Sequence, residues 1–222
     1  ISNLINPQNI IEIGPGNGIL TDIILENDPK ELIIIEKDDD LTNNLKKKYK
    51  NNKKVKIIND DVKNINFCKF KNTKIISNLP YNISTKIILK LLLELNKSSN
   101  EMVFMIQKEV AEKFKYYKNN KKNKYNFFIK ICTDYKIVFN VSNQVFYPKP
   151  KVDSSVVYFK IKNNLINKKN LLNFCNTIFI NQRKKIKNNI KYDMKNLRLL
   201  KIIEQRVENT KIEDLLYLFN KS

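Results

Sequence analysis

Histidine and tryptophan are absent from the 222-residue chain, and only three glycines and three cysteines occur. Without histidine, acid–base catalysis by imidazole is excluded. Cys68, Cys132 and Cys175 lie far apart and form no CxxC pair, so a zinc site of the usual cysteine–histidine kind is not expected. No other metal site is predicted. Scattered cysteines fit a reducing compartment.

Long apolar runs are also missing, and no stretch reaches the roughly 18 residues that a membrane span needs. The sequence begins at Ile1 and not at methionine, so we expect a fragment or a processed product. The expected location is the cytoplasm if the source is bacterial, and an organelle (plastid or mitochondrion) if it is eukaryotic.

Positive charge is in large excess. The 42 Lys and Arg residues against 22 Asp and Glu residues give a formal net charge of +20. Such a protein is commonly held near a polyanion, because neutralising phosphates releases counterions. A genome rich in A and T also favours lysine, asparagine and isoleucine codons. Composition therefore indicates a nucleic acid partner but does not separate it from codon bias.

Alternating apolar runs and helical stretches predict an α/β fold. Strands are predicted at residues 10–13, 32–35, 55–58, 74–77, 102–106, 127–139 and 156–161. Helices are predicted from about residue 19, over 85–95, and through Val110 and Phe114. This order favours a parallel sheet with helices on both faces and functional loops at the carboxyl ends of the strands.

The character of the chain changes near residue 164. Residues 171–180, 183–190, 197–206 and 212–219 have helical spacing and many lysines. We predict a catalytic domain over 1–163 and a small helical C-terminal domain over 164–222. Residues 116–124, rich in lysine and asparagine, are predicted to form a basic loop.

All three glycines lie in one turn, where residues 12–18 read EIGPGNG between a predicted strand and a predicted helix. Glycine allows positive φ and close approach of a ligand to the backbone. The GxGxG spacing argues against a dinucleotide, whose pyrophosphate sits on a helix N-terminus, and suits S-adenosylmethionine, which has no phosphate. A tight turn without a ligand is the alternative.

Acidic residues follow the first strands. Glu12 could face the ammonium group of the cofactor, and Glu36, about 20 residues after Gly16, is placed to take ribose hydroxyls or else to cap a surface turn. Asp61 could accept from the adenine amine of the cofactor. Asp60 competes with it, and spacing does not decide between them.

Residues 77–82, SNLPYN, come directly off the fourth predicted strand. The Asn78 side-chain oxygen and a main-chain carbonyl such as that of Leu79 could accept from an adenine amine and free its lone pair. Pro80 stiffens the turn, and Tyr81 can stack on a base outside its helix. Methyl transfer then depends mainly on alignment and requires no strong base. A plain β-turn with a surface tyrosine is the alternative.

Six motifs together resemble the ribosomal RNA adenine dimethyltransferases, which include the KsgA type and the Erm resistance methylases. They are EIGPGNG at 12–18, IEKD at 35–38, NDD at 59–61, SNLPYNIST at 77–85, IQKEV at 106–110 and PKPKVDS at 148–154. The resemblance covers nearly the whole chain. NQRKK at 181–185 and Asp153 are more similar to the KsgA type than to Erm.

The resemblance implies a class I S-adenosylmethionine-dependent methyltransferase fold, with a Rossmann-like, mostly parallel seven-stranded sheet. It implies dimethylation of the N6 amines of two adjacent adenines near the 3′ end of small-subunit ribosomal RNA. The catalytic residues implied are Asn78, Leu79, Pro80, Tyr81 and Phe146, with Phe146 sandwiching the base opposite Tyr81. The cofactor-binding residues predicted are Glu12, Gly14, Gly16, Glu36, Lys37, Asp61 and Asn78.

The predicted RNA-binding residues are Lys149, Lys151, Arg183, Lys184 and Lys185, although a solvated helix face would also explain the last three. The resemblance implies a monomer that acts on the small ribosomal subunit or its precursor, away from membranes. The family has an N-terminal segment containing Gln-Asn-Phe-Leu, and we expect this sequence to start after it.

Other functions remain open at this stage. An Erm-type enzyme would methylate large-subunit RNA with the same chemistry. A ribosome-assembly or transcription factor could keep the fold without catalysis, although the intact glycine turn and Asn78 argue against that. DNA adenine and protein glutamine methyltransferases carry Asn-Pro-Pro-Tyr or Asp-Pro-Pro-Tyr, and Leu79 argues against both. No residue obviously serves a hydride acceptor, as a nicotinamide dehydrogenase would require.

Overall fold

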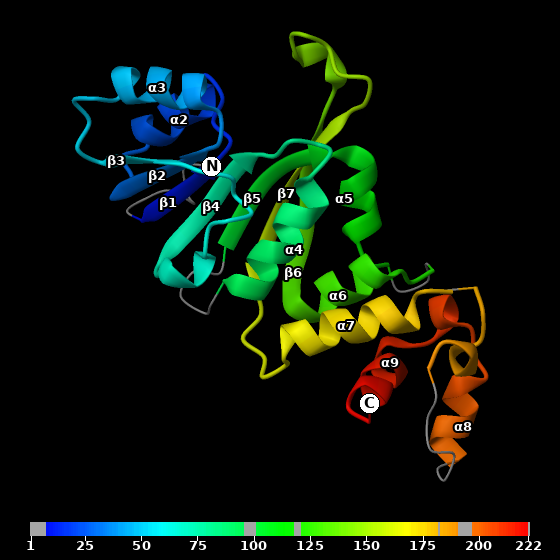
Figure 1. Cartoon of the computed structure of the whole chain (residues 1–222). Coiled ribbons are helices and arrows are strands. Elements are labelled where there is room, and N and C mark those ends of the chain that lie inside the picture. Colours follow the sequence, from blue (N-terminus) through cyan, green and yellow to red (C-terminus); the bar gives the residue numbers. More distant parts are fainter. Residues whose placement is uncertain (1–7, 96–100, 118–120, 182, 191–196, 222) are drawn as a thin grey trace. The chain divides into compact units, whose positions relative to one another are not determined.

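A computed structural model describes residues 8–95, 101–117, 121–181, 183–190 and 197–221. Seven strands form one sheet in the order β3-β2-β1-β4-β5-β7-β6 (Figure 1). The strands are β1 (Asn9–Ile13), β2 (Glu31–Glu36), β3 (Val55–Asn59), β4 (Thr73–Asn78), β5 (Glu101–Gln107), β6 (Thr133–Val141) and β7 (Ser154–Ile161). Strands β1 to β5 pair in parallel, and β7 runs antiparallel to β5. The predicted fold is confirmed.

The central strands are buried on both faces, as in other parallel sheets. Ile10, Leu32 and Ile34 are fully buried and pack with Ile24 from the helix that follows β1. The helices around this sheet are α2 (Ile19–Glu26), α3 (Asp39–Lys48), α4 (Ser84–Glu94) and α5 (Lys108–Phe114). Asp38 caps α3 by accepting from the N–H of Leu41, and lysines fill its last turn, as the helix dipole favours.

Two compact units emerge from the contacts. One contains residues 1–111 and 134–163, and the other contains 112–133 and 164–222. The second unit holds α6 (Lys124–Cys132), α7 (Lys168–Ile178), α8 (Leu197–Ile203) and α9 (Ile212–Phe219). Segment 112–133 therefore groups with the C-terminal helices, whereas the predicted domain limits assign it to residues 1–163. The domain limits of 1–163 and 164–222 stay a prediction.

Two sequence predictions need correction, and a third lies partly outside the described residues. The strand predicted over 127–139 is wrong in its first half, where α6 forms before β6 begins at Thr133. In place of the helix predicted over 183–190, a short 3-10 turn forms at Ile186–Asn188, and α8 ends at Ile203. The basic loop predicted at 116–124 lies partly outside the described residues, and α6 already begins at Lys124.

No helix in the described part of the chain is long and apolar enough to cross a membrane. The same residues contain no group of three or more histidine, cysteine, aspartate or glutamate side chains placed to hold a metal ion.

Candidate active site

The glycine turn and the Asn78 turn meet where the strand order reverses. After β1 the chain continues to β2 and β3 on one side, and β4 returns on the other side of β1. Loops at the carboxyl ends of such neighbouring strands form a crevice in which α/β proteins bind ligands. The hydroxyl of Ser77 donates to the carbonyl of Ile13 and joins the two strand ends.

The three glycines of the turn have positive φ, as expected, but differ in their surroundings. A Cβ added to Gly14 or Gly16 would meet nothing within 4 Å, so the backbone there faces open space. A Cβ on Gly18 would lie 2.6 Å from the hydroxyl of Tyr49. Gly14 and Gly16 can therefore receive a ligand, whereas Gly18 is needed for packing.

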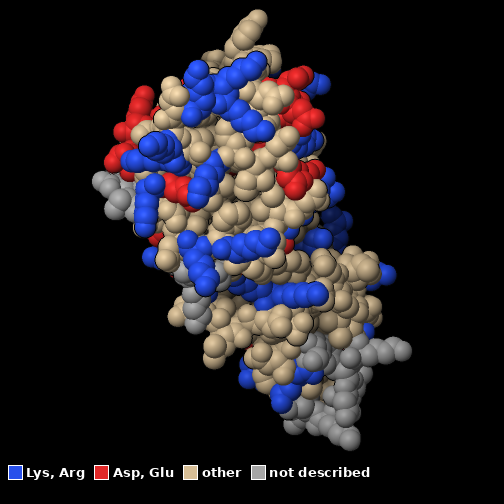
Figure 2. Space-filling model, turned by 60° about the vertical axis from the view of Figure 1, so that its left-hand side comes forward, with Lys and Arg blue, Asp and Glu red and all other residues tan. Residues whose placement is uncertain are grey.

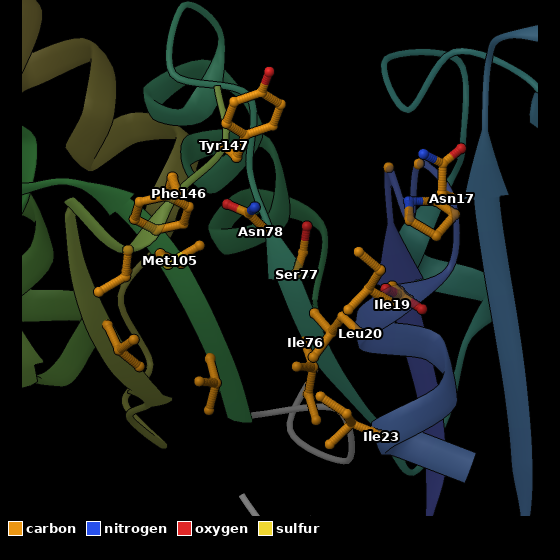
Figure 3. Close-up of a pocket in the computed structure, with 17 residues that line it drawn as sticks. Asn17, Ile19, Leu20, Ile23, Ile76, Ser77, Asn78, Met105, Phe146 and Tyr147 are labelled. Carbon is orange, nitrogen blue, oxygen red and sulfur yellow. The ribbon is translucent and has the colours of Figure 1, made fainter. Parts of the chain in front are cut away.

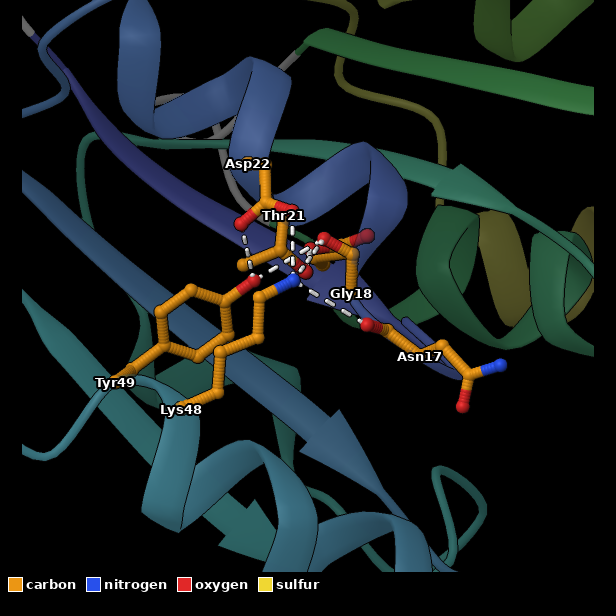
Figure 4. A network of polar contacts seen from close by, with 7 residues as sticks. Asn17, Gly18, Thr21, Asp22, Lys48 and Tyr49 are labelled. Carbon is orange, nitrogen blue, oxygen red and sulfur yellow. Dashed lines mark hydrogen bonds and ion pairs between the residues drawn. The ribbon is translucent and has the colours of Figure 1, made fainter.

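A polar network supports the glycine turn from behind (Figure 4). The Tyr49 hydroxyl, which has one hydrogen to donate, lies 2.8 Å from the Asp22 carboxylate and 3.1 Å from the carbonyl of Gly18. The ammonium of Lys48 binds the other oxygen of Asp22 at 2.6 Å and reaches the Asn17 carbonyl at 3.4 Å. Sequence reasoning missed this support, since Lys48 and Tyr49 lie about 30 residues away, at the C-terminal end of α3.

A cavity of about 640 Å³ lies over β4, between the glycine turn with α2 on one side and β5, β7 and the loop before β7 on the other (Figure 3). Its size is that of a small-molecule site. Glu12, Gly14, Gly16 and Asn78 line it, together with Phe146. Apolar side chains form much of the remaining wall: Ile19, Leu20, Ile23, Ile76, Val103, Met105, Val145 and Val156.

Glu12 is the buried ionisable group of this cavity, with 1% of its surface exposed. One carboxylate oxygen accepts a hydrogen bond of 2.6 Å from the Thr21 hydroxyl. Burial raises the pKa of Glu12 to about 7, because removal from water penalises the charged form more than the Thr21 bond favours it. A cationic ligand group beside Glu12 would offset that cost.

A second cavity of about 300 Å³ adjoins the first and shares Asn78, Phe146 and Tyr147 with it. The turn after β4 and the proline-containing loop enclose it, through Leu79, Pro80, Tyr81, Pro148 and Pro150. Leu79 is buried and donates its N–H to the Met105 carbonyl, which fixes the turn to β5. The predicted catalytic residues therefore surround one slot.

Residues at the start of β7 contact both sides of this slot, the turn after β4 and the loop that carries Phe146. The hydroxyl of Tyr81 lies 2.6 Å from that of the buried Ser154. The Asp153 carboxylate accepts from the N–H of Asn143, at the beginning of the loop that carries Phe146. Since β7 is antiparallel to its neighbour β5, its first residues reach the edge where the parallel strands end.

Comparison with known proteins agrees with this geometry. Residues 2–221 match the model of the family described as "Ribosomal RNA adenine dimethylase". The chain belongs to the ribosomal RNA adenine dimethylase family. This match confirms the family that the motifs predict. It also confirms the predicted enzyme class, a ribosomal RNA adenine dimethyltransferase.

Individual relatives of this dimethylase are similar over most of its length. A ribosomal RNA small subunit methyltransferase A from Hydrogenobaculum is 37% identical, over 96% of this chain and 81% of its own. Its counterpart from Malacoplasma penetrans is 42% identical over 83% and 68%. A dimethyladenosine transferase structure from Plasmodium falciparum superposes with a TM-score of 0.81 at 25% identity, over 99% of this chain and 92% of that one.

The remaining predicted cofactor residues of the dimethylase follow β2 and β3 and do not line the large cavity. Glu36 is mostly buried, and one of its oxygens accepts from the N–H groups of Lys37 and Asp38. The N–H of Asp60 donates to the Glu36 carbonyl. A hydrogen bond from the backbone N–H of Lys63 lowers the pKa of Asp61. These groups lie along the same sheet edge as Gly14.

The predicted RNA-binding residues of the dimethylase belong to two different units. Lys149 and Lys151 are exposed in the loop before β7, whereas Arg183, Lys184 and Lys185 are exposed in the helical unit. Lys185 pairs with Glu204 at 2.8 Å. Figure 2 shows that basic side chains spread widely over the face in view, while acidic ones gather over part of it.

Proposed function

We propose that this chain transfers methyl groups from S-adenosylmethionine to the N6 amines of two adjacent adenines near the 3′ end of small-subunit ribosomal RNA. The observation that carries the proposal is the meeting of two cavities at Asn78, one sized for a cofactor and one walled by aromatic residues. The small-subunit assignment follows the names of the relatives, which are ribosomal RNA small subunit methyltransferases.

The residues of the large cavity fit S-adenosylmethionine, which supplies an activated methyl group. Gly14 and Gly16 leave open space over the backbone. The carboxylate of Glu12 would attract the ammonium group of the cofactor. Glu36 and Lys37 lie outside this cavity, at the same sheet edge, and would hold the ribose. Asp61, at that edge too, would hold the adenine amine, with Asp60 as the competing acceptor.

The slot would hold the target adenine outside its RNA helix. Tyr81 and Phe146 would stack on its two faces, and Pro80 would keep the turn stiff. The Asn78 side-chain oxygen and the Leu79 carbonyl would accept from the amine and free its lone pair towards the methyl group. A new carbon–nitrogen bond replaces the carbon–sulfur bond, and the displaced amine proton leaves to water. Alignment supplies most of the rate enhancement.

The test is incubation of the protein with labelled S-adenosylmethionine and, in separate reactions, unmethylated small or large ribosomal subunits, followed by primer extension. We expect two adjacent dimethyladenines near the 3′ end. Asn78→Ala should reduce labelling by roughly 100-fold or more, as removal of one transition-state hydrogen bond does elsewhere. Asn82→Ala is the matched control, because this exposed asparagine lines neither cavity.

Two outcomes would contradict the proposal. Label on large-subunit RNA would indicate Erm-type specificity. Absence of label from both subunits, with the cofactor bound, would indicate a non-catalytic role in ribosome assembly.

A further inference from the structure

Two lysines converge on one tyrosine ring in the helical unit. The ammonium of Lys113 lies 5.0 Å from the ring centre of Tyr125, and that of Lys124 lies 4.9 Å from the same centre. The two charges are therefore no farther apart than the total of these distances, about 9.9 Å. This maximum separation is about one Debye length at 0.1 M salt, so each ammonium adds to the positive potential that an anion meets beside the other.

The arrangement is built into the backbone. The Asn123 side-chain amide donates to the carbonyl of Lys113 at 3.1 Å. Its oxygen accepts from the N–H groups of Tyr125 and Asn126 and caps α6. The ring of Phe114 contacts that of Tyr125 at 5.9 Å between centres. One asparagine thus fixes the end of α5 to the start of α6.

Negative charge is scarce in the chain segment that carries the pair. Residues 112–130 contain seven lysines and one acidic residue, Glu112. Glu112 accepts from the Tyr117 hydroxyl, and Glu208 lies 3.4 Å from Lys121. In the part of the chain that the structure describes, neither Lys113 nor Lys124 forms an ion pair with a carboxylate. Lys124 instead reaches the side-chain oxygen of Asn176 at 3.4 Å.

We propose that Lys113 and Lys124, held over Tyr125, form a phosphate-binding site for the backbone of ribosomal RNA. This inference rests on the proposed function for the identity of the nucleic acid. Lysine binds phosphate as a point charge, and contacts of this kind fix the register of a protein on RNA without reading its sequence. Packing of α6 against α7 in the same unit gives the site a rigid support.

The experiment measures binding of a fluorescent, unmodified hairpin transcript of small-subunit ribosomal RNA over a range of salt concentrations. Each phosphate contact contributes about 0.7 to 0.9 to the slope of log K against log salt. Because the two lysines form one phosphate site, the double variant Lys113→Ala/Lys124→Ala should lower the slope by roughly 0.7 to 0.9 and weaken binding by roughly 5- to 8-fold at 0.1 M salt. Arginine at both positions should restore both values.

The matched control is Lys54→Ala/Lys56→Ala, which removes two lysines that pair with Asp28 and Glu31 in the other unit. It should leave the slope unchanged. A slope unchanged in the Lys113/Lys124 variant, or reduced equally in both double variants, would overturn the proposal. Because binding is measured without methyl transfer, failure here and failure of the proposed activity are distinguishable.

Discussion

The ionised form of Glu12 that would bind a cationic ligand group is also the form that burial destabilises. Its folded pKa of about 7 lies above the ordinary value of 4.5, so the carboxyl group is protonated in both states below pH 4.5. Between about pH 4.5 and 7 the unfolded chain loses its proton first, and the free energy of unfolding falls as the pH rises. Above pH 7 the full penalty, on the order of 3 kcal/mol, is present.

Glu12→Gln should therefore stabilise the ligand-free protein at pH 8 and leave it unchanged near pH 4.5. The same change should weaken binding of S-adenosylmethionine above pH 7, because the ionised carboxylate is lost. Thermal unfolding at pH 4.5 and pH 8 measures the stability, and calorimetric titration at pH 8 measures the cofactor affinity. Glu26→Gln, at an exposed position of α2, is the control. Equal stability of wild type and Glu12→Gln at pH 8 would contradict the argument.

Ser154 orients Tyr81 through one hydroxyl contact. Ser154→Ala should slow RNA methylation by roughly 5- to 10-fold, as loss of a hydrogen bond of about 1 kcal/mol implies, without changing cofactor affinity. Ser155→Ala removes an equally buried hydroxyl that donates to Asn140 and should have no such effect. A double-mutant cycle with Tyr81→Phe should show non-additive losses, and additive losses would argue against coupling.

Asn78 and the open glycines were predictable from sequence because strand ends and turn chemistry identify them. The residues that hold these groups in place were not predictable from sequence. Lys48 and Tyr49 lie at the C-terminal end of α3, about 30 residues from the turn they support, and Ser154 is 73 residues from Tyr81. Such contacts depend on tertiary packing, which no local pattern encodes.

At the level of elements, the loop between β6 and β7 depends on Asp153. Asp153→Ala removes the acceptor for the Asn143 N–H, so we expect faster hydrogen–deuterium exchange across residues 142–152 and slower methylation. Asp153→Asn keeps a side-chain oxygen at the same place and should exchange like wild type. Exchange unchanged in Asp153→Ala would show that the prolines alone hold the loop.

The error at residues 127–139 has a physical origin. The run is apolar, and no glycine or proline separates its helical half from its extended half. Phe127, Phe128 and Ile129 are buried on several sides of α6, so helical periodicity is hidden. The helix ends where Thr133 adopts extended backbone and its hydroxyl bonds the Ile129 carbonyl.

For the whole molecule, the two compact units predict which fragments can fold. Residues 164–222 alone should lack a cooperative thermal transition, because α7 loses the packing of α6 and Phe179 loses the ring of Phe127 at 6.0 Å. Joining 112–133 to this fragment through a short linker should restore the transition. Circular dichroism during heating measures both. A cooperative transition in 164–222 alone would favour the division predicted from sequence.

The place of β7 in the sheet has a consequence for synthesis on the ribosome. β7 is the last strand made, yet it lies between β5 and β6, which both precede it in the chain. A nascent chain that has reached residue 150 has no neighbour for β6, and β5 presents an unpaired edge. Strands β1 to β5 can assemble as they emerge, whereas β6 cannot join the sheet until β7 has been made. The sheet is therefore completed when β7 inserts between β5 and β6, and not by addition of a last strand at the edge.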